Sequence, residues 1–246
     1  MKKTQLLDAR RNIRKELVSY ISIVIIGMLA SLSYLGITYS AATLKKDALR
    51  FFNDYGLWDI EVVSTALLDE DDLEAIRAVP HVAEAEPVWQ IDTSLRAGGK
   101  NTNVSIISLP DKISRPMLLE GRLPETSAEC AVEKEIMDIC GFSVGQQIVP
   151  DCKPISGVDP LLEKSFVITG VFQTPDHITH MIPVTPYILV REESFNHEGL
   201  GGAFMKIHVR VEGTPQDRYS ADYRNAVTPV AEAINAMAGE RAELRR

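Results

Sequence analysis

The stretch SYISIVIIGMLASLSYLGITYSAA, residues 19–42, carries no charged side chain. It lies in an uncharged run of 28 residues bounded by Glu16 and Lys45. As a helix this run would be roughly 42 Å long at about 1.5 Å per residue, whereas the hydrocarbon core of a membrane is about 30 Å thick. Small residues such as Gly27 and Gly36 weaken a soluble helix but allow a membrane helix to pack closely against a neighbour. We therefore predict a transmembrane helix over residues 19–44.

A cleaved export signal is the main alternative for this stretch. Residues 40–42, Ser-Ala-Ala, offer the small side chains found at signal cleavage sites. However, a signal usually begins with a few basic residues and an apolar core of about 7–15 residues. Here Leu6, Ile13 and Leu17 recur near one helical face with basic residues around the rest, which is typical of a helix on a membrane surface. We predict an amphipathic cytoplasmic helix over residues 1–18 and a retained anchor.

The charge on either side of the span predicts its orientation. Residues 1–16 contain six basic and two acidic residues, a balance of +4, whereas the rest of the chain has 20 basic and 32 acidic residues, a balance of −12. Positive charge ahead of a span holds the N-terminus in the cytoplasm. The residues expected to set the topology are Lys2, Lys3, Arg10, Arg11, Arg14 and Lys15. Residues from 45 onward are then outside, and their acidity argues against binding to nucleic acid, because contacts with nucleic-acid phosphates need a basic face.

The outer part of the chain combines strand and helix patterns, which predicts an α+β fold. Residues 57–65, LWDIEVVST, alternate apolar and acidic side chains as a half-buried strand does, and residues 67–81 predict a short helix that is acidic at its start. Residues 82–109 predict two further extended segments that form a hairpin around AGGKN. Residues 204–213, FMKIHVRVEG, are the clearest strand.

Helical spacing returns after Gln216, with Pro229 expected to bend or break the helix locally. Residues 133–141 predict another short helix, ending at Gly141. The polar final segment, residues 239–246, carries no stop signal, and we expect it to be the start of a helical connection that is cut short.

No catalytic or metal-binding motif is complete in this sequence. The segment PDHITHM places His177 and His180 close together, which gives two weak metal-ligand candidates, but a zinc site needs three or four ligands. A pair of histidines beside a proline turn is more often part of a loop surface. Residues 196–202 are rich in glycine but lack the Gly-Lys-Ser/Thr of a phosphate-binding loop. We therefore expect no enzyme, no metal and no cofactor.

Three cysteines, Cys130, Cys140 and Cys152, lie in the outer part of the chain. Their spacing does not match a zinc ribbon, and three is an odd number for a set of disulfides. One disulfide with one free thiol, or three reduced and packed thiols, are both compatible with the sequence.

The order of these segments resembles the first third of FtsX-like ABC permeases, whose extracytoplasmic region is a MacB-type core domain. The resemblance covers nearly the whole chain, and its most specific parts are EGRLPETSAEC, ICGFSVGQQI and VITGVF. It implies a porter-like α/β subdomain over residues 45–97 and 163–238, with an inserted, mainly β subdomain over residues 98–162.

The resemblance also implies a function and partners. It implies the N-terminal part of a permease subunit of a bacterial plasma-membrane ABC exporter or mechanotransmission complex. The implied partners are a cytoplasmic ABC ATPase, a second or homologous permease, the lipid bilayer, and a peptide, lipoprotein or extracytoplasmic protein that meets exposed loops such as 196–202. A single-span receptor with a ligand-binding outer domain is the alternative from another functional class.

Overall fold

We describe the chain from a computed structural model that covers residues 17–97, 100–155, 157–177 and 185–244. It divides into two units, residues 1–48 and residues 49–246. Helix α2, Leu17–Tyr55, is 39 residues long and is long and apolar enough to cross a membrane, a test that a signal sequence also passes. Along the helix, the hydroxyls of Ser22, Ser31 and Thr38 donate to backbone carbonyls one turn earlier, so these polar groups are satisfied without water.

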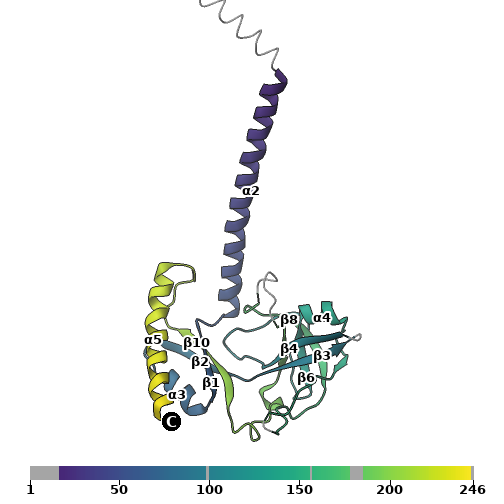
Figure 1. The fold of residues 1–246 in the computed structure, drawn as a ribbon, viewed down its shortest axis with the longest axis vertical. Helices are drawn as coiled ribbons and strands as arrows, with labels where there is room; N and C mark the ends of the chain where they lie inside the picture. The colour runs from purple at the N-terminus through teal and green to yellow at the C-terminus, as the bar shows by residue number, and fades with distance from the viewer. Residues whose placement is uncertain (1–16, 98–99, 156, 178–184, 245–246) are drawn as a thin grey trace, which may run out of the picture. The chain divides into compact units, whose positions relative to one another are not determined.

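The second unit contains a three-stranded antiparallel sheet made from distant parts of the chain. Its strands are β1, Ile60–Leu68, β2, Val82–Val88, and β10, Phe204–Val211, in the order β1-β10-β2. Helices α3, Glu70–Arg77, and α5, Ala221–Leu244, accompany this sheet (Figure 1). The central strand therefore comes from the far end of the chain and lies between two strands from its first part.

The two helices follow from local sequence and from packing. Asp69 and Asp72 form a reciprocal capping box at the start of α3, and each side chain accepts from the other residue's backbone N–H. On α5, Val230 and Ile234 are buried. The helix is continuous through Pro229, so a break at that residue is wrong, while a bend there stays a prediction. A proline ring can be accommodated where tertiary packing holds the helix on both sides.

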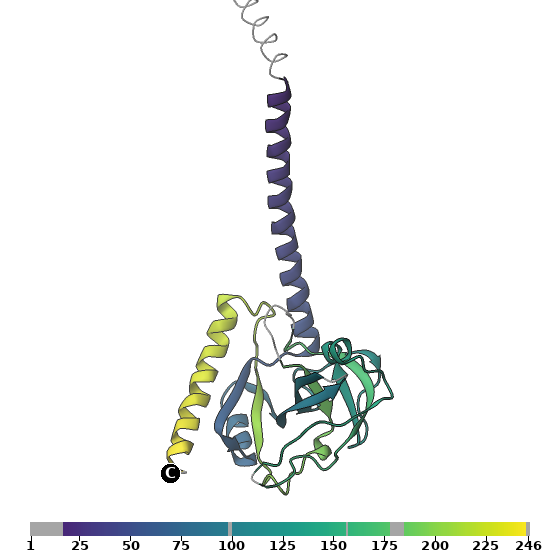
Figure 2. The ribbon, with the colours of Figure 1, turned by 45° about the vertical axis from the view of Figure 1, so that its right-hand side comes forward.

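The segment from residue 90 to residue 190 forms a second, larger sheet (Figure 2). Its seven strands are β3, Gln90–Ala97; β4, Lys100–Ser108; β5, Met117–Gly121; β6, Glu129–Glu133; β7, Gln147–Ile148; β8, Phe166–Gln173; and β9, Tyr187–Val190. The main order is β3-β4-β9-β6-β8-β5, and β7 pairs with β8. The predicted β3–β4 hairpin is antiparallel, as expected. Helix α4, Lys134–Cys140, ends at Gly141 with φ +69°, and a 3-10 turn, η1, covers Glu192–Ser194.

Arg122 holds the EGRLPETSAEC segment together by ion pairs with Glu129 and, at 3.6 Å, with Glu125. The two guanidinium nitrogens of Arg122 donate to the two carboxylate oxygens of Glu129 at 2.9 and 2.5 Å. The same carboxylate accepts the backbone N–H groups of Glu125 and Thr126. The Arg122 hydrogen bond and these backbone donors lower the pKa of Glu129 to about 2. The turn within EGRLPETSAEC, one of the segments on which the family resemblance depends, is thus held by Arg122 and Glu129.

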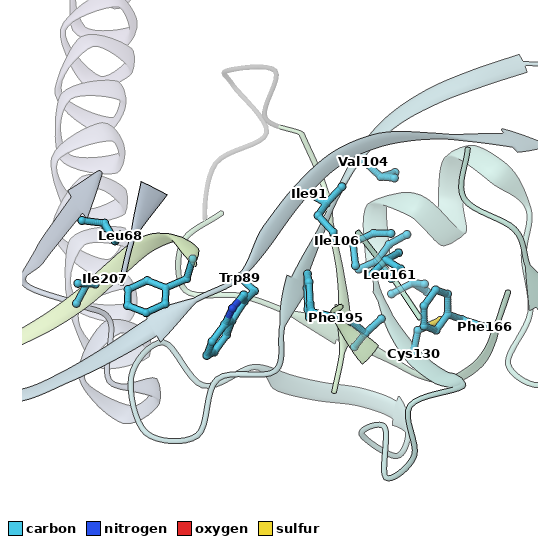
Figure 3. Packing of buried hydrophobic residues seen from close by; sticks show 14 of the residues in the cluster. Leu68, Trp89, Ile91, Val104, Ile106, Cys130, Leu161, Phe166, Phe195 and Ile207 are labelled. Atoms are coloured by element: carbon cyan, nitrogen blue, oxygen red, sulfur yellow. The ribbon is translucent and has the colours of Figure 1, made fainter. Parts of the chain in front are cut away.

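One hydrophobic core runs through both sheets. It includes Leu68 and Ile207 on the three-stranded sheet and Cys130 and Phe166 on the larger one (Figure 3). Trp89, between β2 and β3, contacts Phe204 edge-on with ring centroids 5.6 Å apart, and it lies where the chain passes from one sheet to the other. The indole therefore joins the two halves of the core.

The predicted fold class is confirmed, because an N-terminal apolar helix is followed by a mixed α and β domain. Strands β3, β8 and β9 lie outside the expected insertion of residues 98–162 but share a sheet with its strands. The subdomain bounds themselves stay a prediction.

Candidate functional site: the junction around Asp59

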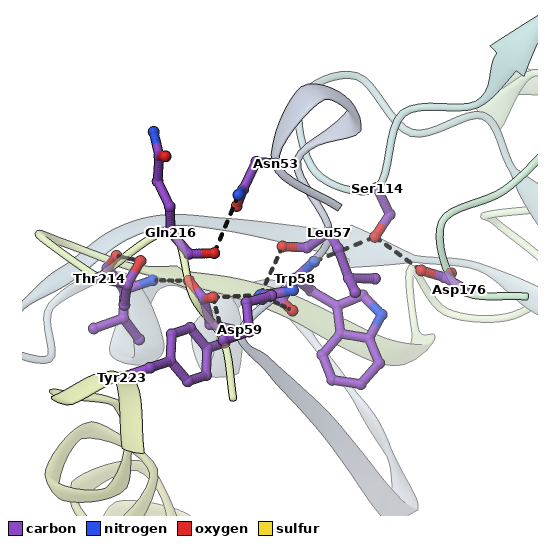
Figure 4. Close-up of polar contacts among 11 residues, drawn as sticks. Asn53, Leu57, Trp58, Asp59, Ser114, Asp176, Thr214, Gln216 and Tyr223 are labelled. Carbon is purple, nitrogen blue, oxygen red and sulfur yellow. Dashed lines mark hydrogen bonds and ion pairs between the residues drawn. The ribbon is translucent and has the colours of Figure 1, made fainter. Parts of the chain in front are cut away.

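Asp59 lies just before β1, and its side chain is only 4% exposed. It accepts a hydrogen bond of 2.6 Å from the hydroxyl of Tyr223 on α5 and one of 2.9 Å from the backbone N–H of Val211 (Figure 4). It also forms a close ion pair with Arg218. Burial and the bond to Asp59 raise the pKa of the Tyr223 hydroxyl, so the tyrosine stays a neutral donor.

Arg218, which lies just before α5, binds residues 57–59, which lie just before β1. Its guanidinium donates to the backbone carbonyls of Leu57 and Trp58 at 3.0 and 2.6 Å, in addition to its ion pair with Asp59. The same guanidinium lies over the ring of Tyr223, 5.2 Å from its centroid. We call Asp59, Arg218 and Tyr223 the Asp59 clamp. It satisfies a buried carboxylate and a largely buried guanidinium together.

The last turn of α2 is tied to a loop from the larger sheet. The backbone N–H of Arg115 donates to the carbonyl of Tyr55 at 2.9 Å, and that of Ser114 donates to Gly56 at 2.8 Å. Asn53 bonds the carbonyl of Gln216 on the approach to α5 (Figure 4). Two segments that are far apart in sequence, residues 114–115 and Gln216, therefore converge on the end of α2.

A second polar group lies on the three-stranded sheet itself. His208, on the central strand, is 7% exposed and places its Nε2 3.3 Å from the Glu61 carboxylate on β1. Lys206 donates to the same carboxylate oxygen at 3.0 Å. The His208 hydrogen bond, opposed by burial and aided by Lys206, lowers the pKa of Glu61 to about 2. Trp58 stacks on the His208 ring with centroids 5.7 Å apart.

Asp176 connects the two groups to the larger sheet. It follows β8 and accepts a 3.0 Å hydrogen bond from the Ser114 hydroxyl, whose oxygen in turn accepts the backbone N–H of Trp58 at 3.3 Å (Figure 4). Burial raises the pKa of the Asp176 carboxyl. Ser114 adopts φ +56°, a left-handed conformation that is uncommon for a residue with a side chain. The loop is held in this conformation by bonds on both sides of the serine.

Of the metal-ligand and topology residues predicted from the sequence, only His177 lies in the described part of the chain. His177 does not belong to an exposed loop surface, because its side chain is 10% exposed and its Nδ1 lies 3.0 Å from Glu133. His180 and the six residues expected to set the topology lie outside the described residues. Among the described residues, no group of three or more histidine, cysteine, aspartate or glutamate side chains is arranged to hold a metal.

The three cysteines are free thiols, which is one of the two arrangements the sequence allows. Cys130 is fully buried, and burial raises its pKa, so it is held as an unreactive thiol. Cys140 and Cys152 pack partly buried against the core.

Sequence reasoning missed the Asp59 clamp and the Asp176 link. Asp59 reads as the solvent face of an alternating strand, and its partners lie 159 and 164 positions away. No local signal marks such a pairing. The site joins Asp59, just before β1, to the end of β10 and to the start of α5 through buried polar bonds.

The solved structures that this domain is similar to include an extracellular domain of a transporter, a periplasmic region and a domain of a permease protein. They include the extracellular domain of the ABC-type transporter YknZ from Gram-positive bacteria, with 14% identity, a TM-score of 0.44, and coverage of 72% of this chain and 87% of that one. The periplasmic region of MacB from Actinobacillus actinomycetemcomitans shows 13% identity and a TM-score of 0.43, over 72% of this chain and 76% of that one.

A domain of a permease protein from Porphyromonas gingivalis shows 14% identity and a TM-score of 0.41, over 68% of this chain and 75% of that one. No protein-family model matches the chain. No curated protein matches it either. The likeness is therefore one of fold alone.

Proposed function

We propose that this chain is the N-terminal part of the permease subunit of an ABC exporter or mechanotransmission complex. Its outer domain would couple ATP hydrolysis in the cytoplasm to the handling of a substrate or partner outside the membrane. The supporting observation is that α2 is one helix of 39 residues whose last turn is bonded into the domain. This arrangement is suited to carrying a displacement and offers no catalytic group.

The Asp59 clamp gives the proposal a physical basis. A helix resists stretching because each turn is hydrogen-bonded to the next. At the end of α2, backbone bonds from residues 114 and 115 attach Gly56 and Tyr55 to the larger sheet, and the clamp attaches the start of β1 to α5. A movement of residues 49–55 would therefore be passed to both sheets. Neither sheet could stay in place during that movement unless these polar bonds broke.

The partners in this proposal are a cytoplasmic ABC ATPase, a second permease copy and the surrounding bilayer. The outer domain would meet a peptide, lipoprotein or extracytoplasmic protein through its loops, including residues 196–202. Loops on a rigid sheet can vary in shape without disturbing the core. Residues 98–162 would be the inserted subdomain that presents further loops.

Isolation of the protein from native membranes in mild detergent tests the proposal. We expect an ABC ATPase to co-purify, and we expect replacement of residues 196–202 by a glycine-serine loop of equal length to impair export while that ATPase stays bound. Asp59→Asn should likewise reduce export more than ATPase binding, because it loosens the clamp. A preparation that contains no ATPase but a signalling kinase would contradict the proposal and favour a receptor.

A further inference from the structure

We draw no further inference here: the strongest candidate, the apolar groove of about 570 Å³ between the edge strand β1 and helix α5, whose wall includes Val63, Ile234 and Met237, carries none because nothing among the described residues shows what covers it.

Discussion

Tyr223 donates a hydrogen bond of 2.6 Å to Asp59, although 164 positions separate the two residues. The bond joins the first turn of α5 to the residue that precedes β1. Because both residues lie beside Arg218, one buried carboxylate holds a tyrosine hydroxyl, a guanidinium and a backbone N–H at once. The start of β1, the end of β10 and the start of α5 are thereby held together at one carboxylate.

Loss of the Asp59 charge should destabilise the domain strongly. Asp59→Asn leaves Arg218 largely buried without its counter-ion, and breaking a buried pair from one side costs about 3–5 kcal/mol. Tyr223→Phe removes one hydrogen bond to a charged acceptor, which is worth about 1.5–3 kcal/mol. Urea unfolding of the full chain in detergent, followed by near-ultraviolet circular dichroism, measures both changes.

Tyr219→Phe is the matched control for the tyrosine change, because Tyr219 lies four residues earlier and is 59% exposed. We expect its effect to be within about 0.5 kcal/mol, as for most surface substitutions. Equal losses in Tyr223→Phe and Tyr219→Phe would show that the clamp contributes no specific stability.

Gly170→Ala should disrupt the larger sheet. A Cβ at Gly170 would lie 2.3 Å from the carbonyl oxygen of Arg122 and 3.0 Å from that of Glu120, and backbone cannot move aside as a side chain can. Overpacking costs about 1–3 kcal/mol even in side-chain cores, so we expect at least that loss or failure to fold.

Gly141→Ala separates this clash from backbone strain. Gly141 has φ +69° with open space around its Cβ position, so only the left-handed penalty of roughly 1–2 kcal/mol applies. A melting temperature for Gly170→Ala at or above that of Gly141→Ala would argue against the close strand approach.

Glu61→Gln should lower stability in a pH-dependent way. The pKa of Glu61 is lowered to about 2 by its hydrogen bond to His208 and by Lys206, against the opposing effect of burial. A lowered pKa contributes stability above the ordinary glutamate value of about 4.3, and this stability is lost as the pH falls towards 2. The difference in free energy of unfolding between wild type and Glu61→Gln should therefore be full at neutral pH and vanish near pH 2. Glu120→Gln, an exposed change on β5, provides the comparison, and an unchanging difference for Glu61→Gln would refute the ion pair.

Cysteine labelling in intact cells should reveal the orientation. With Cys130, Cys140 and Cys152 replaced by alanine or serine, single cysteines before Glu16 should be protected from an impermeant maleimide. Single cysteines after about Asn53 should react, because the +4 flank holds the N-terminus in the cytoplasm. The reverse pattern would invert the topology and remove the basis of the proposed function.

Local features of this fold could be predicted from the sequence. The acidic run from Asp69 to Asp72 does lie at the start of α3, and Gly141 does end α4 in a left-handed conformation. On β10, Ile207, Val209 and Val211 are buried as their alternation indicates, whereas Met205, on the same face of the pattern, is exposed. These features depend on residues a few positions apart, where hydrogen-bond geometry and periodicity are decisive.

The polar side of the same strands could not be predicted. Asp59 and His208 occupy positions that alternation assigns to solvent, yet both are buried. Arg218 and Tyr223 cover the first, and Trp58 and Glu61 lie against the second. Whether a polar face of a strand is covered depends on which distant segment packs over it. No pattern among neighbouring residues in a single sequence indicates that segment. The pairing of His177 with Glu133 escaped prediction for the same reason.

The position of β10 between β1 and β2 has a consequence for how the protein is made. All seven strands of the larger sheet have been synthesised once Val190 is added, before β10 is made, so that sheet can assemble first from contiguous chain. The smaller sheet lacks its middle strand until Phe204–Val211 follows, and β1 and β2 must wait unpaired. During that interval their apolar edges are exposed, which is when strands are most prone to pair wrongly. Maturation of the domain is thus expected to end at strands β1 and β2, which follow α2 in the chain.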